Sequence, residues 1–238
     1  MDIVYVLGTG SKWNDNELRY SLRSVEKYLN GYEKVFIVGE KPKWLQNIIH
    51  ISYPDTHKEK ETRIAKKIYQ ACLDERVSRD FLFINDDHFF NREVYGPSFP
   101  NYYSDTLQNE FDKKNVNMIY RSAIKNTIDL LNVYGIKNNK FFDVHYPIMY
   151  NRNSFIRLFN SINWDVEFSY VIKSLYGNMF DCIGTKVADC KIDHFYEIDF
   201  ILDKIKGQNV FSVGDRGLSE NMKSILETMF PEKSKYEI

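Results

Sequence analysis

The first half of the chain alternates short apolar runs with longer amphipathic segments. Four runs have the length and composition of buried strands: 3–7, 35–38, 48–51 and 81–84. In the segment 15–29, Leu18, Leu22 and Val25 recur at the spacing of one helix face, and 62–76 repeats this pattern. Short strands that alternate with amphipathic helices predict an α/β fold with a mostly parallel, doubly wound sheet flanked by helices.

The second half is less regular and more helical. Its pattern predicts helices and one late strand, the helices at 122–134, 153–162, 166–175 and 219–230, and the strand at 186–192. No linker-like stretch interrupts the chain, so we expect one domain over 1–238. Residues 1–95 would form a nucleotide-binding half, and 96–238 would cover the sheet edge and receive an acceptor.

Composition excludes several classes of protein. The 238 residues carry 32 basic and 33 acidic side chains, which gives no general reason to expect nucleic acid binding. The three cysteines are odd in number and lack the spacing of a metal finger, as expected in a reducing cytoplasm. The amino terminus lacks a signal-peptide pattern, and no apolar run approaches the ~20 residues of a membrane span. The sequence carries no signal for an oligomeric state.

The most informative stretch is 81–90, Phe-Leu-Phe-Ile-Asn-Asp-Asp-His-Phe-Phe. A strand-like run ends abruptly in the adjacent carboxylates of Asp86 and Asp87. Carboxylates at the carboxyl end of a parallel strand suit a Mg²⁺ or Mn²⁺ ion that grips a nucleotide diphosphate. The alternative is that these residues only end the strand and form a turn.

The glycine-rich segment after the first strand would lie at the same edge of the sheet. Gly8, Thr9, Gly10 and Ser11 resemble the start of a dinucleotide fingerprint, but Trp13 stands where the third glycine belongs, which argues against a redox cofactor. A tight loop that lets a nucleotide approach the backbone and an ordinary strand-to-helix turn both remain open.

Basic residues on the two predicted helices are candidates for phosphate binding. Arg19 and Arg23 share one helix face, and Arg63 and Lys66 belong to the second helix. The alternative for Arg19 and Arg23 is a surface ion pair, and for Arg63 and Lys66 it is a solvated basic surface. Farther along, Asp143 or His145 is a candidate base for removing a proton from an acceptor hydroxyl, and the alternative is a buried, hydrogen-bonded histidine.

Several segments together resemble the Stealth family. Residues 14–28, Asn-Asp-Asn-Glu-Leu-Arg-Tyr-Ser-Leu-Arg-Ser-Val-Glu-Lys-Tyr, resemble its second conserved block, as do 35–38 and 42–45. Residues 83–90 resemble the family's Asn-Asp-Asp-x-Phe-Phe block, and 145–147 its His-x-Pro segment. One departure is clear: the family has a Trp-Val-Asp-Gly-like segment after its first strand, and no aspartate stands there in this chain.

The resemblance implies a glycosyltransferase-A-like fold and a transferase that uses a nucleotide sugar. Asp86 and Asp87 would hold Mn²⁺ or Mg²⁺, His194 would complete the metal shell by analogy with such enzymes, and Asp87 would also take part in catalysis. We expect a UDP-sugar donor, a glycan or a modified nucleobase as acceptor, and a bacterial or phage protein in the cytoplasm.

Three functions follow in order of expectation. The first is metal-dependent glycosyl transfer, the second is Stealth-type transfer of a sugar 1-phosphate, and the third is an inactive nucleotide- or sugar-binding module. The missing early aspartate is the best support for the third.

Overall fold

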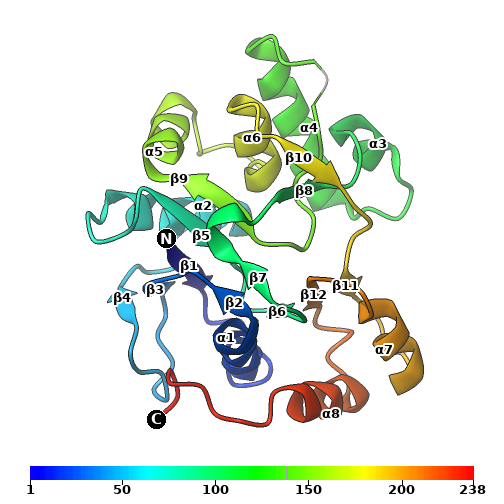
Figure 1. The fold of residues 1–238 in the computed structure, drawn as a ribbon. Coiled ribbons are helices and arrows are strands. Elements are labelled where there is room, and N and C mark those ends of the chain that lie inside the picture. Colours follow the sequence, from blue (N-terminus) through cyan, green and yellow to red (C-terminus); the bar gives the residue numbers. More distant parts are fainter. Residues whose placement is uncertain (138) are drawn as a thin grey trace.

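The structure is a computed structural model that describes residues 1–137 and 139–238 (Figure 1). The first half contains β1 (Asp2–Leu7), α1 (Asn16–Tyr28), β2 (Leu29–Asn30), β3 (Val35–Gly39), β4 (Ile49–Ile51), α2 (Lys60–Leu73), β5 (Asp80–Phe83), β6 (His88–Phe90) and β7 (Val94–Tyr95). The second contains the short 3₁₀ helix η1 (Gly96–Ser98), β8 (Asn101–Tyr103), α3 (Leu107–Asp112), α4 (Met118–Val133), β9 (Ile148–Asn151), α5 (Arg152–Ser161), α6 (Ile172–Met179), β10 (Gly184–Lys186), β11 (Lys191–Ile192), α7 (Ile198–Ile205), β12 (Val210–Val213) and α8 (Glu220–Met229).

The main sheet has the strand order β4-β3-β1-β5-β9. β1 pairs in parallel with β3 and β5, and β4 pairs in parallel with β3. The central strands are almost wholly buried because helices cover the sheet, which explains their unbroken apolar runs. The predicted α/β fold with a mostly parallel sheet is therefore confirmed.

The fifth strand of this sheet comes from the second half of the chain. β9 pairs antiparallel with β5, so that Phe83 lies opposite Ile148. The pattern analysis assigned no strand there, because four residues between a loop and a helix are too few to show a period of two. The two halves consequently share one sheet, and their buried apolar side chains form one core.

After β5 the chain enters a smaller, three-stranded sheet with the order β11-β12-β6. β6 pairs antiparallel with β12, which pairs in parallel with β11. The predicted strand at 186–192 is in fact two short strands, β10 and β11, in different sheets. The predicted helix at 166–175 begins only at Ile172, because Phe168 and Ser169 have positive φ values of 67° and 56°, which a right-handed helix cannot contain.

Figure 1 shows how the chain returns to its starting half at the end. After α8, the last residues run past α1 and finish beside the loop between β3 and β4. In that segment Glu237 forms an antiparallel bridge with Leu45. In the part of the chain that the structure describes, every helix is too short or too polar to cross a bilayer.

Candidate active site

Two adjoining cavities lie at the carboxyl edge of the main sheet. The sheet-edge cavity, of about 650 Å³, is lined by residues 8–11 after β1, 85–87 after β5, the first turns of α2 and the loop after β12. The helical cavity, of about 860 Å³, lies among α2, α3, α4, α6 and residues 141–145. Lys60, Ile64, Asn85 and Lys191 line both cavities and mark the junction between them.

The structure brings the two segments predicted at the sheet edge into one cavity. Gly8, Thr9, Gly10 and Ser11 line the sheet-edge cavity together with Asp86 and Asp87. This follows from parallel pairing, because the carboxyl ends of β1 and β5 meet at one edge.

The carboxylates of the acid pair repel each other and lack full compensation. Burial, followed by the charges of Asp87 and Glu17, raises the pKa of Asp86 to about 7. Asp87 Oδ2 accepts a hydrogen bond of 3.2 Å from Ser212, while its buried Oδ1 has no hydrogen-bond partner among the described residues. His88 Nε2 lies 3.8 Å from that Oδ1, but burial holds the pKa of His88 well below its usual value, so the ring is neutral.

An unsatisfied carboxylate oxygen beside a second carboxylate fits a divalent cation. Across residues 1–137 and 139–238, however, no cluster of three or more Asp, Glu, His or Cys side chains could hold an ion alone. The predicted third ligand, His194, is half exposed and lines neither cavity. Its Nε2 lies 3.6 Å from Oδ2 of Asp193. The structure therefore does not bring His194 to the acid pair.

The Stealth-like segment on α1 anchors the strand that leaves the acid pair. Ser21 Oγ donates a 2.7 Å hydrogen bond to the carbonyl of His88, and Ser24 Oγ accepts one of 2.9 Å from the amide of Phe90. Tyr5 on β1 contacts Ser21 Oγ at 2.9 Å. These buried bonds fix β6 against α1, and with it the turn that presents the two carboxylates.

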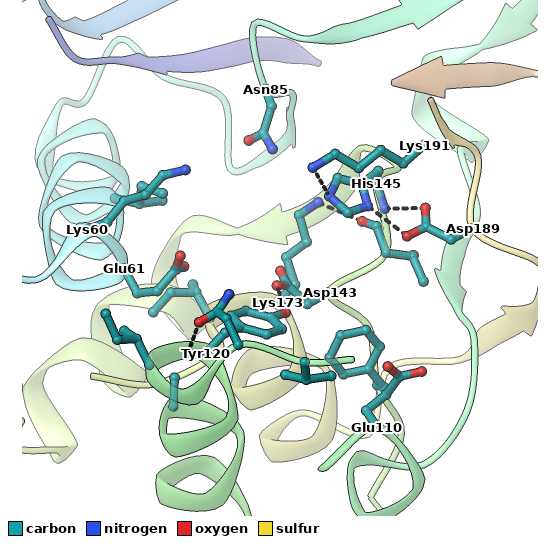
Figure 2. Close-up of a pocket in the computed structure, with 18 of the residues that line it drawn as sticks. Lys60, Glu61, Asn85, Glu110, Tyr120, Asp143, His145, Lys173, Asp189 and Lys191 are labelled. Atoms are coloured by element: carbon teal, nitrogen blue, oxygen red, sulfur yellow. Dashed lines mark hydrogen bonds and ion pairs between the residues drawn. The ribbon is translucent and has the colours of Figure 1, made fainter. Parts of the chain in front are cut away.

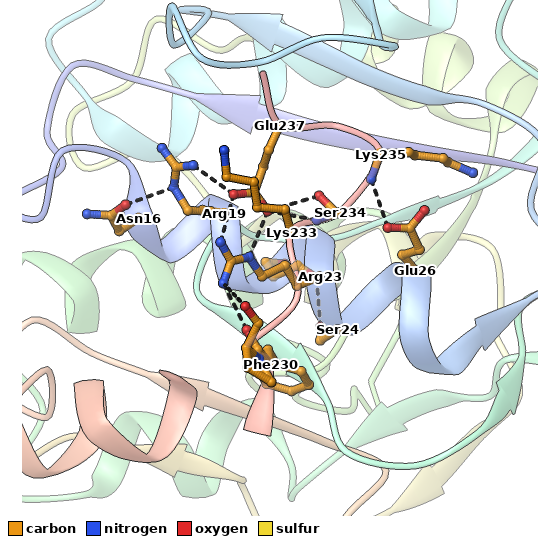
Figure 3. A network of polar contacts seen from close by, with 12 residues as sticks. Asn16, Arg19, Arg23, Ser24, Glu26, Phe230, Lys233, Ser234, Lys235 and Glu237 are labelled. Atoms are coloured by element: carbon orange, nitrogen blue, oxygen red, sulfur yellow. Dashed lines mark hydrogen bonds and ion pairs between the residues drawn. The ribbon is translucent and has the colours of Figure 1, made fainter. Parts of the chain in front are cut away.

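The two arginines of the same segment do not line either cavity. Arg23 forms a two-pronged ion pair with Glu237, with contacts of 2.7 and 2.8 Å, and Arg19 bonds to the same carboxylate at 2.7 Å (Figure 3). The guanidinium of Arg19 also stacks over Trp44, 4.2 Å from the ring centroid. The structure thus places Arg19 and Arg23, predicted to hold the nucleotide, outside both cavities, because the returning C-terminal segment occupies both of them.

The basic residues of α2 divide according to the helical period. Arg63 lines the sheet-edge cavity as predicted, whereas Lys66 lines neither cavity. Lys60 and Lys67, which the sequence analysis missed, are the partners of Arg63 on that face. Lys60, Arg63 and Lys67 are spaced by three and four residues and therefore share one helix face. Lys66 points about 100° away from Lys67 around the helix axis, so it lies off that face.

Lys67 brings a further carboxylate to the end of β1. Its ammonium donates to the carbonyl of Leu7 and lies 2.5 Å from Asp55 Oδ1. Asp55 in turn fits against Gly8, where a Cβ would come within 2.9 Å of Asp55 Oδ2. An acid thus lies beside the end of β1 although the sequence has none in the segment after that strand.

His145 faces the helical cavity with its ring held by Asp189 (Figure 2). Asp189 accepts from the ring Nδ1 at 2.7 Å and from the backbone amide of His145 at 3.1 Å. Burial alone would raise the pKa of Asp189, but the hydrogen bonds from the ring and the backbone amide of His145 hold it below its usual value. Lys191 Nζ lies 3.0 Å from the other ring nitrogen, Nε2.

The backbone around His145 is fixed on both sides. The buried ammonium of Lys173 donates to the carbonyls of Val144 and Tyr146 at 3.0 and 2.8 Å. The thiol of Cys190 donates to the carbonyl of His145 itself at 3.0 Å. Asp189, Lys191 and Lys173 were invisible to sequence reasoning, because they approach His145 from later parts of the chain.

A second acidic group lies deeper in the helical cavity. Asp143 accepts a short hydrogen bond from the hydroxyl of Tyr120 on α4. Burial, and then the charge of Asp143, raises the pKa of Glu61 on α2 to about 7. Figure 2 shows these groups below Asn85 and Lys60. Both predicted base candidates, Asp143 and His145, therefore line the same cavity.

Comparison with known proteins gives local sequence matches. No family model matches the chain. Over 105 residues, 38% of this chain, it is 30% identical to the human N-acetylglucosamine-1-phosphotransferase subunits alpha/beta. Over 94 residues, 35% of this chain, it is 34% identical to a capsular polysaccharide phosphotransferase of Actinobacillus suis. The matches span 8% and 25% of the lengths of those relatives.

The fold matches solved structures over nearly the full chain. The galactosyltransferase LgtC, solved with donor and acceptor sugar analogs, superposes with a TM-score of 0.50 at 10% identity over 99% of this chain and 98% of its own. An active-site mutant of LgtC gives a TM-score of 0.52 at 12% identity with the same coverage. The chain therefore shares its overall fold with the galactosyltransferase LgtC and a local stretch of sequence with sugar-phosphate transferases.

Proposed function

We propose that this protein is a transferase that moves a sugar phosphate from a nucleotide sugar to an acceptor hydroxyl. The donor binds in the sheet-edge cavity, and the acceptor enters the helical cavity. The observation that carries this proposal is the junction of the cavities. Of the four described residues that line both cavities, Lys60 and Lys191 are positively charged, and Ile64 and Asn85 are uncharged.

The charge at the junction separates two reactions. A transferred phosphoryl group carries negative charge on its oxygens, which lysine ammonium groups stabilise. Glycosyl transfer passes through a cation-like sugar ring, which two lysines at the same place would disfavour. The relatives matched in sequence are named phosphotransferases, which supports the same reaction. This reverses the order expected from the sequence, in which glycosyl transfer came first.

Asp86 and Asp87 are the residues that would hold Mg²⁺ or Mn²⁺. Their adjacent carboxylates and the unpartnered Oδ1 of Asp87 fit such an ion, with donor phosphate oxygens completing the shell that two carboxylates leave open. When bound, the ion would neutralise charge on the donor phosphates. Arg63 and the backbone of residues 8–11 line the space beside them.

His145 is the base in this proposal. Because Asp189 accepts from Nδ1, the lone pair of the neutral ring lies on Nε2, on the side of Lys191. The acceptor oxygen forms a bond to the donor's β-phosphorus, Nε2 takes the hydroxyl proton, and the phosphoanhydride bond breaks. The electron pair of that bond leaves with the nucleoside monophosphate. Asp143, supported by Tyr120, would bind the acceptor deeper in the cavity.

The test uses water as the acceptor, so that the natural acceptor need not be known. The protein is incubated with UDP-N-acetylglucosamine and Mn²⁺, and the products are separated by anion-exchange chromatography. Sugar-phosphate transfer to water releases UMP, whereas glycosyl transfer releases UDP. We expect UMP, its loss in the double variant Asp86→Ala, Asp87→Ala, and full activity in the control Asp129→Ala, an exposed aspartate on α4 that lines neither cavity.

Each other outcome favours a different function. Release of UDP would support glycosyl transfer, for which the fold shared with LgtC is the supporting observation. Saturable donor binding that is indifferent to Mn²⁺ and gives no turnover would support the inactive binding module. Asp55 weakens the case for that module, because it supplies an acid beside β1. We also propose that the donor is a UDP-sugar and the acceptor a glycan. A panel of nucleotide sugars tests the choice of donor.

A further inference from the structure

Lys191 lines both cavities, and its ammonium group is hydrogen-bonded to the ring of His145. The carboxylate of Asp189 can only accept, so the bond of 2.7 Å to His145 places the ring proton on Nδ1. The other ring nitrogen, Nε2, is then an acceptor, and Lys191 Nζ donates to it over 3.0 Å. The lone pair that would receive the acceptor's proton is therefore already occupied.

We propose that Lys191 caps His145 in the empty site and leaves it for the donor's phosphates when the donor binds. This inference rests on the proposed function, since it assigns a role within the same site. Lys191 is thereby a positioning residue that makes the base available only when a donor is in place. Donor binding would precede productive acceptor binding.

The position of Lys191 allows this exchange. Its side chain lines both cavities, so one ammonium group has access to either side of the junction. It passes over Gly214 of the sheet-edge cavity, where a Cβ would come within 2.7 Å of Lys191 Cε and 3.4 Å of Nζ. The absence of a side chain at Gly214 leaves room for the lysine.

The backbone of Lys191 is fixed, which confines the movement to its side chain. β11 pairs with β12, so that Lys191 lies opposite Ser212, and the carbonyl of Lys191 accepts a 2.9 Å hydrogen bond from Lys204. His145 is held equally firmly by Asp189, Cys190 and Lys173. Exchange of the contact then costs only the rotation of a lysine side chain.

The charges favour the exchange. Among the described residues, the side-chain hydrogen-bond partner of the Lys191 ammonium is the ring nitrogen Nε2 of His145 and not a carboxylate. A phosphate offers a charged acceptor, so the ammonium gains the Coulomb attraction of opposite charges in addition to the hydrogen bond. The donor's phosphates are therefore the stronger partner for this ammonium.

The experiment follows the ring nitrogens of His145 by NMR of protein labelled with ¹⁵N-histidine, with inorganic pyrophosphate as the probe and His145→Gln to assign the resonances. Calorimetry measures pyrophosphate binding on the same samples. In the wild type we expect the Nε2 resonance to move toward the position of an unbonded lone pair as pyrophosphate saturates. Nδ1 should remain protonated.

Two variants isolate the lysine. In Lys191→Met, the Nε2 resonance should take the unbonded position before pyrophosphate is added, and pyrophosphate should bind about tenfold more weakly. In Gly214→Ala, the added methyl group displaces the lysine side chain, and the free protein should move toward the same position. Lys113→Met is the matched control, because Lys113 also lines the helical cavity but pairs with Glu110, and its response should equal the wild type.

The outcomes separate this inference from the function on which it rests. Saturable pyrophosphate binding with an unchanged Nε2 resonance overturns the capping role and leaves the proposed function standing. An equal response in wild type and Lys191→Met does the same. A Gly214→Ala protein that keeps the wild-type resonance with and without pyrophosphate also overturns it. Absence of pyrophosphate binding in the wild type overturns both.

Discussion

Replacing Glu237 by glutamine tests the role that the structure gives to the two arginines of α1. The Glu237 side chain is completely buried and bonds to Arg23 at 2.7 and 2.8 Å and to Arg19 at 2.7 Å. Its Oε1 also accepts from the amide of Ser234 at 2.9 Å. The substitution keeps the shape of the side chain and removes its charge, so that two cations lose their shared partner.

The expected loss of stability is about 2–3 kcal/mol. Breaking a buried ion pair on one side costs roughly 3–5 kcal/mol. Arg19 and Arg23 are 21% and 11% exposed, so water recovers part of that cost when the carboxylate is gone. For a chain of this size, each kcal/mol corresponds to about 2–4 °C in Tm, which predicts a drop of roughly 5–10 °C.

The pH dependence gives an independent check with a definite sign. Burial alone would raise the pKa of Glu237, but the hydrogen bonds from Arg23, Ser234 and Arg19 lower it from 4.5 to about 2. A carboxyl whose pKa is lower in the folded state stabilises the fold above its unfolded pKa and loses that contribution as the pH falls through the folded value. The difference between wild type and Glu237→Gln should be constant above about pH 5 and shrink steadily between 4.5 and 2.

Urea unfolding at several pH values measures the difference, and Glu220→Gln is the control. Glu220 also pairs with a lysine, at 2.7 Å, but its side chain is 89% exposed, so its loss should cost less than about 1 kcal/mol. Pyrophosphate affinity is measured on the same proteins. Equal losses in the two variants would refute the tail-anchoring role. A tenfold tighter affinity in folded Glu237→Gln would show that the freed Arg19 and Arg23 can act in donor binding after all.

Two further predictions concern charges inside the cavities. Burial and Asp143 raise the pKa of Glu61 from 4.5 to about 7, so the folded state loses stability as the pH rises through that interval and stays less stable above it. Glu61→Gln should therefore be more stable than wild type at pH 8.5, by on the order of 2 kcal/mol, with the gain vanishing below about pH 4.5; a gain independent of pH in urea unfolding would contradict this. Lys67→Met leaves Asp55 without its ion pair and should lower the free energy of unfolding by about 3 kcal/mol. Adding Asp55→Asn should restore part of this loss, because the unpaired charge is then removed. No recovery in the double variant would argue against the ion pair.

The sequence by itself determined the frame of the site. Strand-length apolar runs and helical spacings fixed the parallel arrangement of β1, β3, β4 and β5 and the buried face of α1. Parallel strands place their carboxyl ends at one edge, so the meeting of residues 8–11 with Asp86 and Asp87 was predictable. The sequence also singled out Asp143 and His145, which line one cavity, because an aspartate and a histidine beside a proline are visible without a structure.

Only the tertiary structure decided which side chains meet. Arg23 and Glu237 are 214 residues apart, and no local pattern links them, so the arginines were assigned to phosphate instead. Asp189 and Lys191 reach His145 across more than 40 residues and fix which of its nitrogens carries the proton. Local periodicity reports the face of an element and its burial, whereas the partner of a charged side chain depends on how distant elements pack. That packing gave the Stealth-like segment its place behind the acid pair and put Lys191 between the two cavities.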